Sequence, residues 1–165
     1  MSDDGSQLPV APSPRRRSSG WTLVELAVAF AVLAVLVALA LPIYGGYQER
    51  ARVGQAIADM QAITTRIASF RREFGQVPTS IDTVMNPLPQ DPWGNPYHYL
   101  RIAGAPPSVI AQARKDRNLV PINSDYDLYS AGPDRQTRPP LAANVSQDDV
   151  IRANDGRFFG RASSY

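Results

Sequence analysis

The 165-residue sequence contains no cysteine and a single histidine, His98. Disulfide bonds and thiol chemistry are therefore excluded, and a structural zinc site built from cysteine and histidine lacks its ligand set. Neither charge dominates, since 17 Lys and Arg face 15 Asp and Glu, for a formal net charge of +2. That surplus is too small for a strong nucleic-acid-binding surface, so no nucleic-acid partner is expected. The length suits one modest domain.

Motifs of common enzyme classes are also missing. The sequence has no G-x-S-x-G nucleophile motif, no P-loop and no dinucleotide-binding glycine pattern. His98 lies in an alternating Tyr-His-Tyr run, where a lone histidine is more often a strand residue than a general base. We therefore expect no catalytic residues and a protein that is not an enzyme.

What the sequence does contain is one long apolar run. From Trp21 to Ile43, 23 residues carry one ionisable side chain, that of Glu25. At about 1.5 Å per residue, a helix of this length spans the roughly 30 Å of a bilayer's hydrocarbon core. A buried core helix is the alternative, but the rest of the chain could hardly cover a helix that is apolar on every face. A transmembrane helix is therefore predicted at residues 21–43.

The segment before this run, residues 1–20, is rich in Pro and Ser and predicts a disordered leader. Arg15, Arg16 and Arg17 lie directly before the apolar run, so the positive-inside rule places the N-terminus in the cytoplasm and the C-terminal part across the membrane. Residues 41–44 are a poor match to a signal-peptidase site. The apolar segment is therefore expected to be retained.

After Pro42 and a Gly-Gly pair, a helical pattern resumes and ends at Gly75, a good C-cap. Apolar residues recur there at spacings of three and four: Val53, Ile57, Met60, Ile63 or Thr64, Ile67, and Phe70 or Phe74. The opposite face is polar, so this half is predicted to pack on a soluble domain. The two halves predict one long helix with a weak point at Pro42, where a backbone donor is lost.

Beyond Gly75 the sequence is rich in Pro and Gly and predicts a small antiparallel sheet on the helix, an α+β fold. The strand candidates are Tyr97–Ile102, Ser108–Ala111 and Tyr126–Ser130, with a last short strand or packed tail after the turn at residues 154–156. Residues 91–96 predict a turn and residues 114–118 a charged connection. We expect Trp93, Pro96 and Tyr97 to fill a small core.

Glu25 is the one acid inside the apolar run. A carboxylate costs about 2.5–3.5 kcal/mol toward the bilayer centre and is usually retained for a partner. A plain structural explanation is that Glu25 favours the dipole at the helix N-terminus or lies among the lipid headgroups. The residues around it give a second explanation, because Gly20, Trp21, Thr22, Leu23 and Glu25 resemble the processing motif of the type IV pilin and type II secretion pseudopilin superfamily.

This resemblance implies a type IV pilin-like fold and a processing route. A prepilin peptidase would cut between Gly20 and Trp21 and methylate the new N-terminus at Trp21. Glu25 of one subunit would then pair with the Trp21 amine of its neighbour and fix the axial register of a homopolymer. The chain would divide into a leader at 1–20, a transmembrane and filament-core helix at 21–43, an amphipathic helix at 44–75 and a small sheet with an ordered loop at 76–165.

Two later motifs point to one branch of the superfamily. The run D-P-W-G-N-P-Y at 91–97 and the run Y-D-L-Y-S-A-G-P-D at 126–134 resemble the major (core) pseudopilin of type II secretion. In that branch a C-terminal loop holds a calcium ion. By resemblance, the ligands here would be the backbone carbonyl of Ala131 and the side chains of Asp134, Ser146, Asp148 and Asp149, all hard oxygen donors.

One departure from this branch lies in the same loop. The segment at 135–145 looks longer and more basic than the family's usual glycine-rich loop. The plain explanation for the acids is that Asp148 and Asp149 are surface or N-cap residues and Asp134 a turn residue. Asp155 is a weaker further candidate. The lack of cysteine favours this branch over adhesive pilins, many of which close the region with a disulfide.

The resemblance thus implies a structural subunit of the type II secretion pseudopilus that drives protein export across the outer membrane. Its partners would be copies of itself, minor pseudopilins, the prepilin peptidase, the inner-membrane assembly platform and, before assembly, membrane lipid. It would be a single-pass protein of the bacterial inner membrane with a periplasmic C-terminal domain, and part of a periplasmic pseudopilus after assembly. A type IV or DNA-uptake pilus subunit is one alternative, and a membrane-tethered periplasmic binding domain is another.

Overall fold

The computed structural model describes residues 20–165, apart from the side chains of residues 41–44. Most of the predicted leader, including Arg15, Arg16 and Arg17, lies outside the described residues. Contacts divide the chain into two compact units, Met1–Pro42 and Ile43–Tyr165.

The longest element is helix α1, Leu23–Phe74, with 52 residues. Between residues 23 and 40 its large apolar side chains are exposed, from 84% for Leu23 to 48% for Val37. Within the described residues, α1 is the one helix long and apolar enough to cross a membrane. The helix continues through Pro42, so the predicted weak point does not end it; a proline removes one backbone donor and leaves the others.

The second half of α1 packs on a sheet. Its innermost residues Ala56, Met60, Ile63 and Ile67 are at most 1% exposed and follow spacings of four, three and four, which confirms the predicted apolar stripe. Ala56 was not expected in it, because a methyl group gives little apolar signal. Phe74 was expected in the stripe as an alternative to Phe70 but is 56% exposed, since it is the last helical residue before Gly75 turns the chain with φ of 74°.

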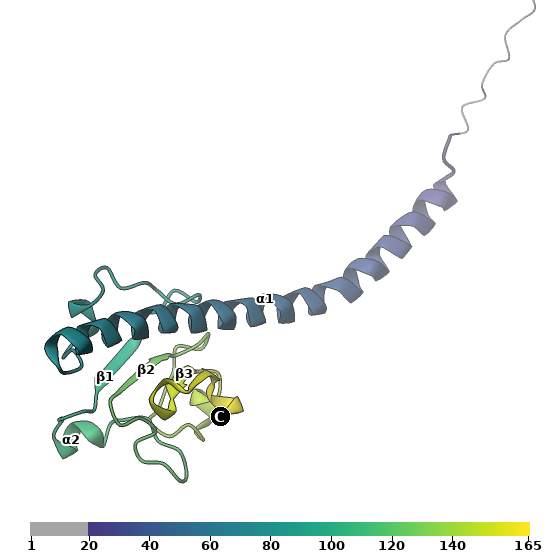
Figure 1. Ribbon diagram of the computed structural model, residues 1–165. Coiled ribbons are helices and arrows are strands. Elements are labelled where there is room, and N and C mark those ends of the chain that lie inside the picture. The colour runs from purple at the N-terminus through teal and green to yellow at the C-terminus, as the bar shows by residue number, and fades with distance from the viewer. Residues whose placement is uncertain (1–19) are drawn as a thin grey trace, which may run out of the picture. The chain divides into compact units, whose positions relative to one another are not determined.

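Four strands form an antiparallel sheet in the order β1-β2-β3-β4, and the first three are labelled beside α1 in Figure 1. Their bounds are His98–Arg101 for β1, Tyr126–Ser130 for β2, Val150–Ala153 for β3 and Phe158–Arg161 for β4. Tyr99 is paired with Leu128, and Tyr129 with Ile151. The predicted α+β fold, a long helix on a small antiparallel sheet, is therefore confirmed.

Two apolar clusters lie on the two faces of this sheet. Tyr126, Leu128 and Val150 belong to the cluster that includes the buried stripe of α1. Ile151 and Ala153 belong to a second cluster, formed with side chains of the loops: Ile122, Leu141 and Ala162. Val150 contributes to one cluster and Ile151 and Ala153 to the other, while Arg152 is paired with Asp125, and all four residues of β3 are buried. The C-terminal loop is thereby packed against the sheet face that α1 does not cover.

Some predicted elements differ from the observed ones. The strand candidate Ser108–Ala111 is instead a short helix, α2, Pro107–Ile110, because the prolines at its start favour the first helical turn. Strand β3 was missed, since Asp148, Asp149 and Arg152 break its apolar pattern. The turn at residues 154–156 and the last strand after it are confirmed. Short 3₁₀ turns complete the chain: η1 Ile81–Thr83, η2 Asn144–Ser146, η3 Asn154–Gly156 and η4 Ala162–Ser164.

Candidate functional site

Thr22 and Glu25 form a reciprocal cap at the start of α1. The Thr22 backbone N–H and hydroxyl each donate to Glu25 Oε2 at 2.9 Å. The Glu25 backbone N–H donates in turn to Thr22 Oγ1 at 3.2 Å. This is the capping box that the spacing T-x-x-E permits, a signal in the sequence that the motif-based interpretation of Glu25 passed over. Within one chain the carboxylate is thus engaged at the helix end, as the plain structural explanation has it.

Trp21 lies next to this cap with 78% of its surface exposed. Its backbone nitrogen is still joined to Gly20, so the amine that would pair with Glu25 exists only after cleavage. Pairing with a neighbouring subunit requires that second copy, and the role of Trp21 and Glu25 in assembly stays a prediction.

The turn that follows Gln90 is organised by one buried carboxylate. Asp91 Oδ1 accepts hydrogen bonds from the backbone N–H groups of Trp93 and Asn95, and Asp91 Oδ2 accepts one from the hydroxyl of Ser130. The Asn95 side-chain amide donates to the Gly132 carbonyl oxygen at 3.1 Å. The two motifs that carry the pseudopilin resemblance, at 91–97 and 126–134, are therefore hydrogen-bonded to each other.

The aromatic residues of this turn contact α1. The Trp93 Nε1–H donates to Glu49 at 3.4 Å, and the Tyr97 hydroxyl donates to Asp59 at 3.0 Å. Burial, with the Asp59 carboxylate, raises the pKa of Tyr97 well above its usual value. Trp93 and Tyr97 pack against the core as predicted. Pro96 is exposed instead, because it bridges Gln90 at the rim of the turn.

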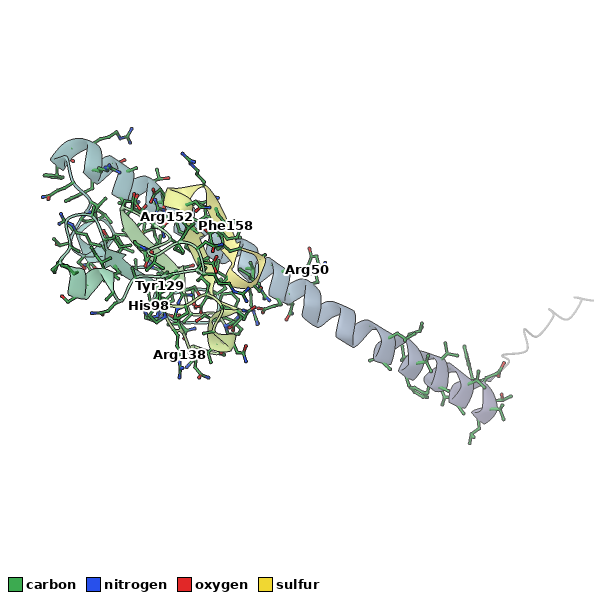
Figure 2. The ribbon with its side chains drawn as sticks, turned by 90° about the horizontal axis from the view of Figure 1, so that it is seen from below. Arg50, His98, Tyr129, Arg138, Arg152 and Phe158 are labelled. Carbon is green, nitrogen blue, oxygen red and sulfur yellow. The ribbon has the colours of Figure 1, made fainter. Side chains whose placement is uncertain are left out.

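His98 is a strand residue, as predicted. Its ring stacks on that of Tyr129, 4.8 Å between centroids, on the neighbouring strand β2 (Figure 2). Burial and the nearby Arg114 charge lower the pKa of His98, so the imidazole is neutral at pH 7.

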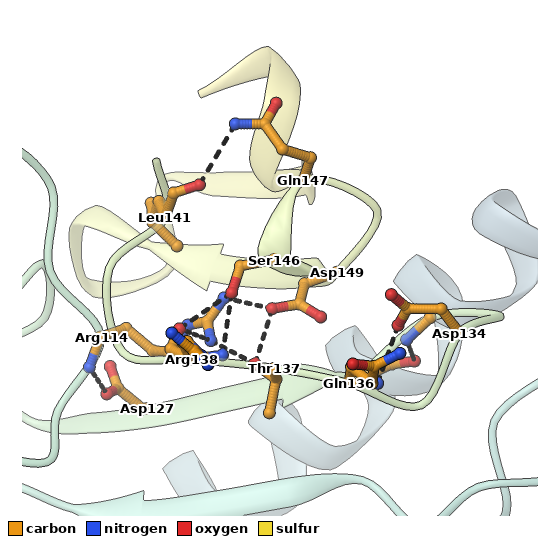
Figure 3. A network of polar contacts seen from close by, with 12 residues as sticks. Arg114, Asp127, Asp134, Gln136, Thr137, Arg138, Leu141, Ser146, Gln147 and Asp149 are labelled. Carbon is orange, nitrogen blue, oxygen red and sulfur yellow. Dashed lines mark hydrogen bonds and ion pairs between the residues drawn. The ribbon is translucent and has the colours of Figure 1, made fainter. Parts of the chain in front are cut away.

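Two of the predicted calcium ligands, Asp134 and Ser146, form hydrogen bonds with different parts of the loop. Asp134 is exposed and its Oδ1 accepts from the Gln136 backbone N–H at 2.7 Å, apart from Ser146 and Asp149 (Figure 3). The Ser146 hydroxyl is buried, accepts from the Arg138 N–H at 2.9 Å and donates to the Arg138 carbonyl oxygen at 3.0 Å. Both groups are thus occupied by the loop's own backbone.

Asp148 and Ala131 lie beside Gly132. A Cβ on Gly132 would come within 2.8 Å of the Asp148 carbonyl oxygen and 3.0 Å of its Oδ2, and the φ of Gly132 is 66°. Glycine is therefore needed here for both space and backbone conformation. Ala131 is buried, 2% exposed. The structure brings these two predicted ligands near the same turn.

Asp149 is fully buried and forms an ion pair with Arg114, which is itself 2% exposed. The same carboxylate oxygen accepts from the Thr137 hydroxyl at 2.7 Å. Burial raises the pKa of Asp149 to about 6, and the Arg114 charge opposes this rise. The predicted charged connection at 114–118 does lie between α2 and β2, but Arg114 within it is buried and paired with Asp149.

These residues, as arranged, do not fit a calcium ion. Calcium takes 6–8 oxygen ligands, whereas no three acidic or histidine side chains converge on one point in the part of the chain that the structure describes. One feature speaks for a further group: Asp149 Oδ1 is buried and, among the described residues, has no hydrogen-bond partner. A single free oxygen does not make a calcium site, and the expectation of calcium rests on the resemblance alone.

Comparison with known proteins agrees with the N-terminal geometry. Residues 15–41 match the family model described as the prokaryotic N-terminal methylation motif. A protein of Aeromonas hydrophila, named type II secretion system core protein G, is 31% identical, over 52% of this chain and 75% of that relative. The chain belongs to the type II secretion system core protein G family.

Other relatives support the same assignment. The core protein G of Pseudomonas aeruginosa is 28% identical, over 73% of this chain and 87% of that relative. The type IV major fimbrial protein FimA of Dichelobacter nodosus is 27% identical, over 68% of this chain and 69% of that relative, so pilin is the weaker match. No solved structure matches. The long apolar helix and the methylation motif fit a single-pass inner-membrane protein.

The resemblance to core protein G drew attention to the turn motifs, but it did not indicate that Arg114 is buried and contacts the C-terminal loop. Its guanidinium reaches residues 23 to 35 positions later, Thr137, Arg138 and Asp149. In the sequence Arg114 looks the same as the exposed Arg117 three positions on. The nearest available signal was the basic, proline-containing segment at 135–145, which departs from the family pattern.

Proposed function

We propose that this protein is a structural subunit of a type II secretion pseudopilus, processed between Gly20 and Trp21 and then polymerised to drive protein export across the outer membrane. The observation that carries the proposal is the methylation motif, which covers Gly20 to Glu25 at the start of an exposed apolar helix in a chain of the core protein G family. The protein is not an enzyme in this proposal, because its task is assembly.

The exposed apolar surface of α1 supports assembly into a filament. Between residues 23 and 40 the apolar side chains have no partners within the described residues and are exposed all round, a surface suited first to lipid and then to neighbouring copies. Cleavage creates an ammonium group at Trp21, where prepilin peptidase would also add a methyl group. Glu25 then exchanges its Thr22 contacts for the amine of a neighbour, since an unpaired charge inside an apolar bundle is costly.

The proposal also assigns the domains and their membrane topology. Residues 1–20 are the cytoplasmic leader, 21–43 cross the inner membrane and form the filament core, 44–75 continue into the periplasm, and 76–165 form the periplasmic sheet and loop. The partners are further copies, minor pseudopilins, prepilin peptidase, the assembly platform and, before assembly, membrane lipid.

Substitution of Glu25 tests the proposal. In cells that overproduce the protein, Glu25→Ala is expected to remain membrane-inserted and to be cleaved after Gly20, yet to yield no sheared filaments. The matched control is Glu73→Ala, an exposed acid at the other end of α1, which should assemble normally. Filaments are measured by immunoblot of the sheared fraction and by electron microscopy. Wild-type filament yield from Glu25→Ala would contradict the register mechanism.

A type IV or DNA-uptake pilus subunit is the second candidate, favoured by the FimA match. Deletion of the gene separates the two, because loss of exported enzymes from the medium indicates secretion, whereas loss of surface pili with normal export indicates a pilus. A membrane-tethered binding domain would form no filament in either assay.

A further inference from the structure

Asp149 places a carboxylate in the interior of the unit Ile43–Tyr165, which we call the body, where the C-terminal loop (residues 131–149) joins strand β3. It is 0% exposed, and it immediately precedes β3, which is buried along its whole length. A buried carboxylate needs a cation or several hydrogen-bond donors, because desolvation otherwise forces it to take up a proton. Which group neutralises Asp149 therefore decides how the loop is held.

The Arg114 guanidinium contacts both the acid and the loop. Its Nη2–H donates to Asp149 Oδ2, and its Nη1–H donates to the Thr137 hydroxyl and to the Arg138 carbonyl oxygen at 2.7 Å (Figure 3). Its carbon Cζ lies 4.6 Å from the centroid of the Tyr129 ring. One cation thus joins β2, the loop and the start of β3.

The backbone of Arg114 is fixed as well. Its N–H donates to Asp127 Oδ2, and Asp127 Oδ1 accepts from the Asn123 side-chain amide at 2.9 Å. Asp127 is 1% exposed, so the backbone of Arg114 is anchored to a buried side chain of β2. Such a fixed planar fork can satisfy several oxygen acceptors at once.

We propose that the Arg114 guanidinium is a built-in cation that clips the C-terminal loop to the sheet, in the place where the pseudopilin resemblance predicts calcium. The proposal does not rest on the pseudopilus function. A calcium ion on the free Asp149 Oδ1 would share one carboxylate with the guanidinium, and like charges at such short range repel strongly. The Ser146 hydroxyl and Asp134 Oδ1, which calcium would need, already bind loop backbone.

The first test uses the unmodified, full-length protein solubilised in a non-ionic detergent. Its Tm is measured by circular dichroism in millimolar calcium chloride and in excess EGTA, and calcium chloride is titrated into the chelated protein by calorimetry. We expect the same Tm in both solutions and no heat of binding. A Tm that falls in EGTA, or saturable calcium binding, would overturn the proposal.

The second test removes the clip. Arg114→Gln is expected to lower the Tm by about 10 °C, because the acid is left buried and unpaired. Arg138→Gln is the matched control: it removes one arginine from the clipped loop, but that side chain is exposed (Figure 2), and the Tm of this variant should stay within about 1 °C of that of the unmodified protein. Equal Tm values for Arg114→Gln and the unmodified protein would reject the clip.

A double variant tests whether Arg114 and Asp149 stabilise the protein as an interacting pair or independently of each other. If Arg114 acts through Asp149, the Tm loss of Arg114→Gln with Asp149→Asn is smaller than the sum of the two single losses, whereas additive losses would count against the clip. Arg114→Lys covers the case in which Arg114→Gln does not fold. It keeps the charge without the fork, so its Tm should be lower than that of the unmodified protein, and an unchanged Tm would again reject the proposal.

Discussion

Leu33 and Ile63 lie on the same helix, α1, yet 54% of Leu33 is exposed and Ile63 has no exposed surface. Charged residues differ in the same way. Glu25 is exposed and capped by Thr22, whereas Asp149 and Arg152 are buried and paired with groups of the body. The N-terminal unit therefore leaves its apolar surface exposed, while the body buries its apolar stripe and pairs these buried charges internally. Three predictions, two of them with a matched control substitution, test this contrast inside one molecule.

The largest effect is expected at Arg152. Its two Nη atoms donate to the two oxygens of Asp125, each at 2.8 Å, and its guanidinium lies 4.0 Å from the centroid of the Tyr126 ring. Arg152→Gln should lower the free energy of unfolding by about 3–5 kcal/mol, since Asp125 loses its partner in a mostly buried site. Urea unfolding followed by circular dichroism measures this.

The control for Arg152 is a neighbouring arginine. Arg157 is exposed, and Arg157→Gln should change the free energy of unfolding by less than about 0.5 kcal/mol. Equal losses for the two variants would mean that the body is stabilised by overall positive charge and not by the buried pair.

The next largest effect is expected at Ile63, in the buried part of α1, and Leu33 in the exposed part provides the comparison. Ile63→Ala should destabilise the body by about 2–5 kcal/mol, through lost burial and the cavity left beside Met60. Leu33→Ala removes as much apolar surface but should leave urea unfolding of the body unchanged, because Leu33 belongs to the other unit. If Leu33→Ala also destabilises the body in detergent, the two units are energetically coupled and the contrast fails.

The smallest effect is at Asp155, on the surface of the body. Burial opposes the shift, but the backbone N–H and hydroxyl of Ser124, with the Arg152 charge, lower the pKa of Asp155. Its contribution to stability is therefore present above the unfolded pKa, near 3.8, and is lost as pH falls through the lower folded value. Asp155→Asn should flatten the loss of Tm between about pH 5 and pH 3, and an unchanged pH profile would contradict the assigned contacts.

Local patterns predicted much of this structure. The stripe from Met60 to Ile67, the strand at Tyr126–Ser130 and the turn at 91–96 each rest on spacing or turn chemistry within a few residues, and all are present. The strand predicted at Ser108–Ala111 failed because the two prolines before it favour a helical turn over a strand.

The interior charges could not be predicted in this way. Whether Arg114 or Arg117 is buried depends on where Thr137 and Asp149 come to lie after folding, and no nearby residue encodes that. The calcium ligands were inferred from similarity of motifs, which carries over residue types but not the contacts made by a basic loop. The capping box formed by Thr22 and Glu25, in contrast, could have been predicted from the T-x-x-E spacing alone.

The ion pair between Glu49 and Arg161, 2.6 Å between Oε1 and Nη2, bears on the order of events during synthesis. It joins residues 112 positions apart, and β4 supplies the outer partner for every residue of β3. The body can therefore close only when Arg161 has left the ribosome and arrived beside Glu49 of α1. The apolar half of α1 is made long before the strands that complete the body, so in the proposed topology its insertion into the membrane precedes folding of the body. A chain cut short before β4 would leave β3 as an open edge.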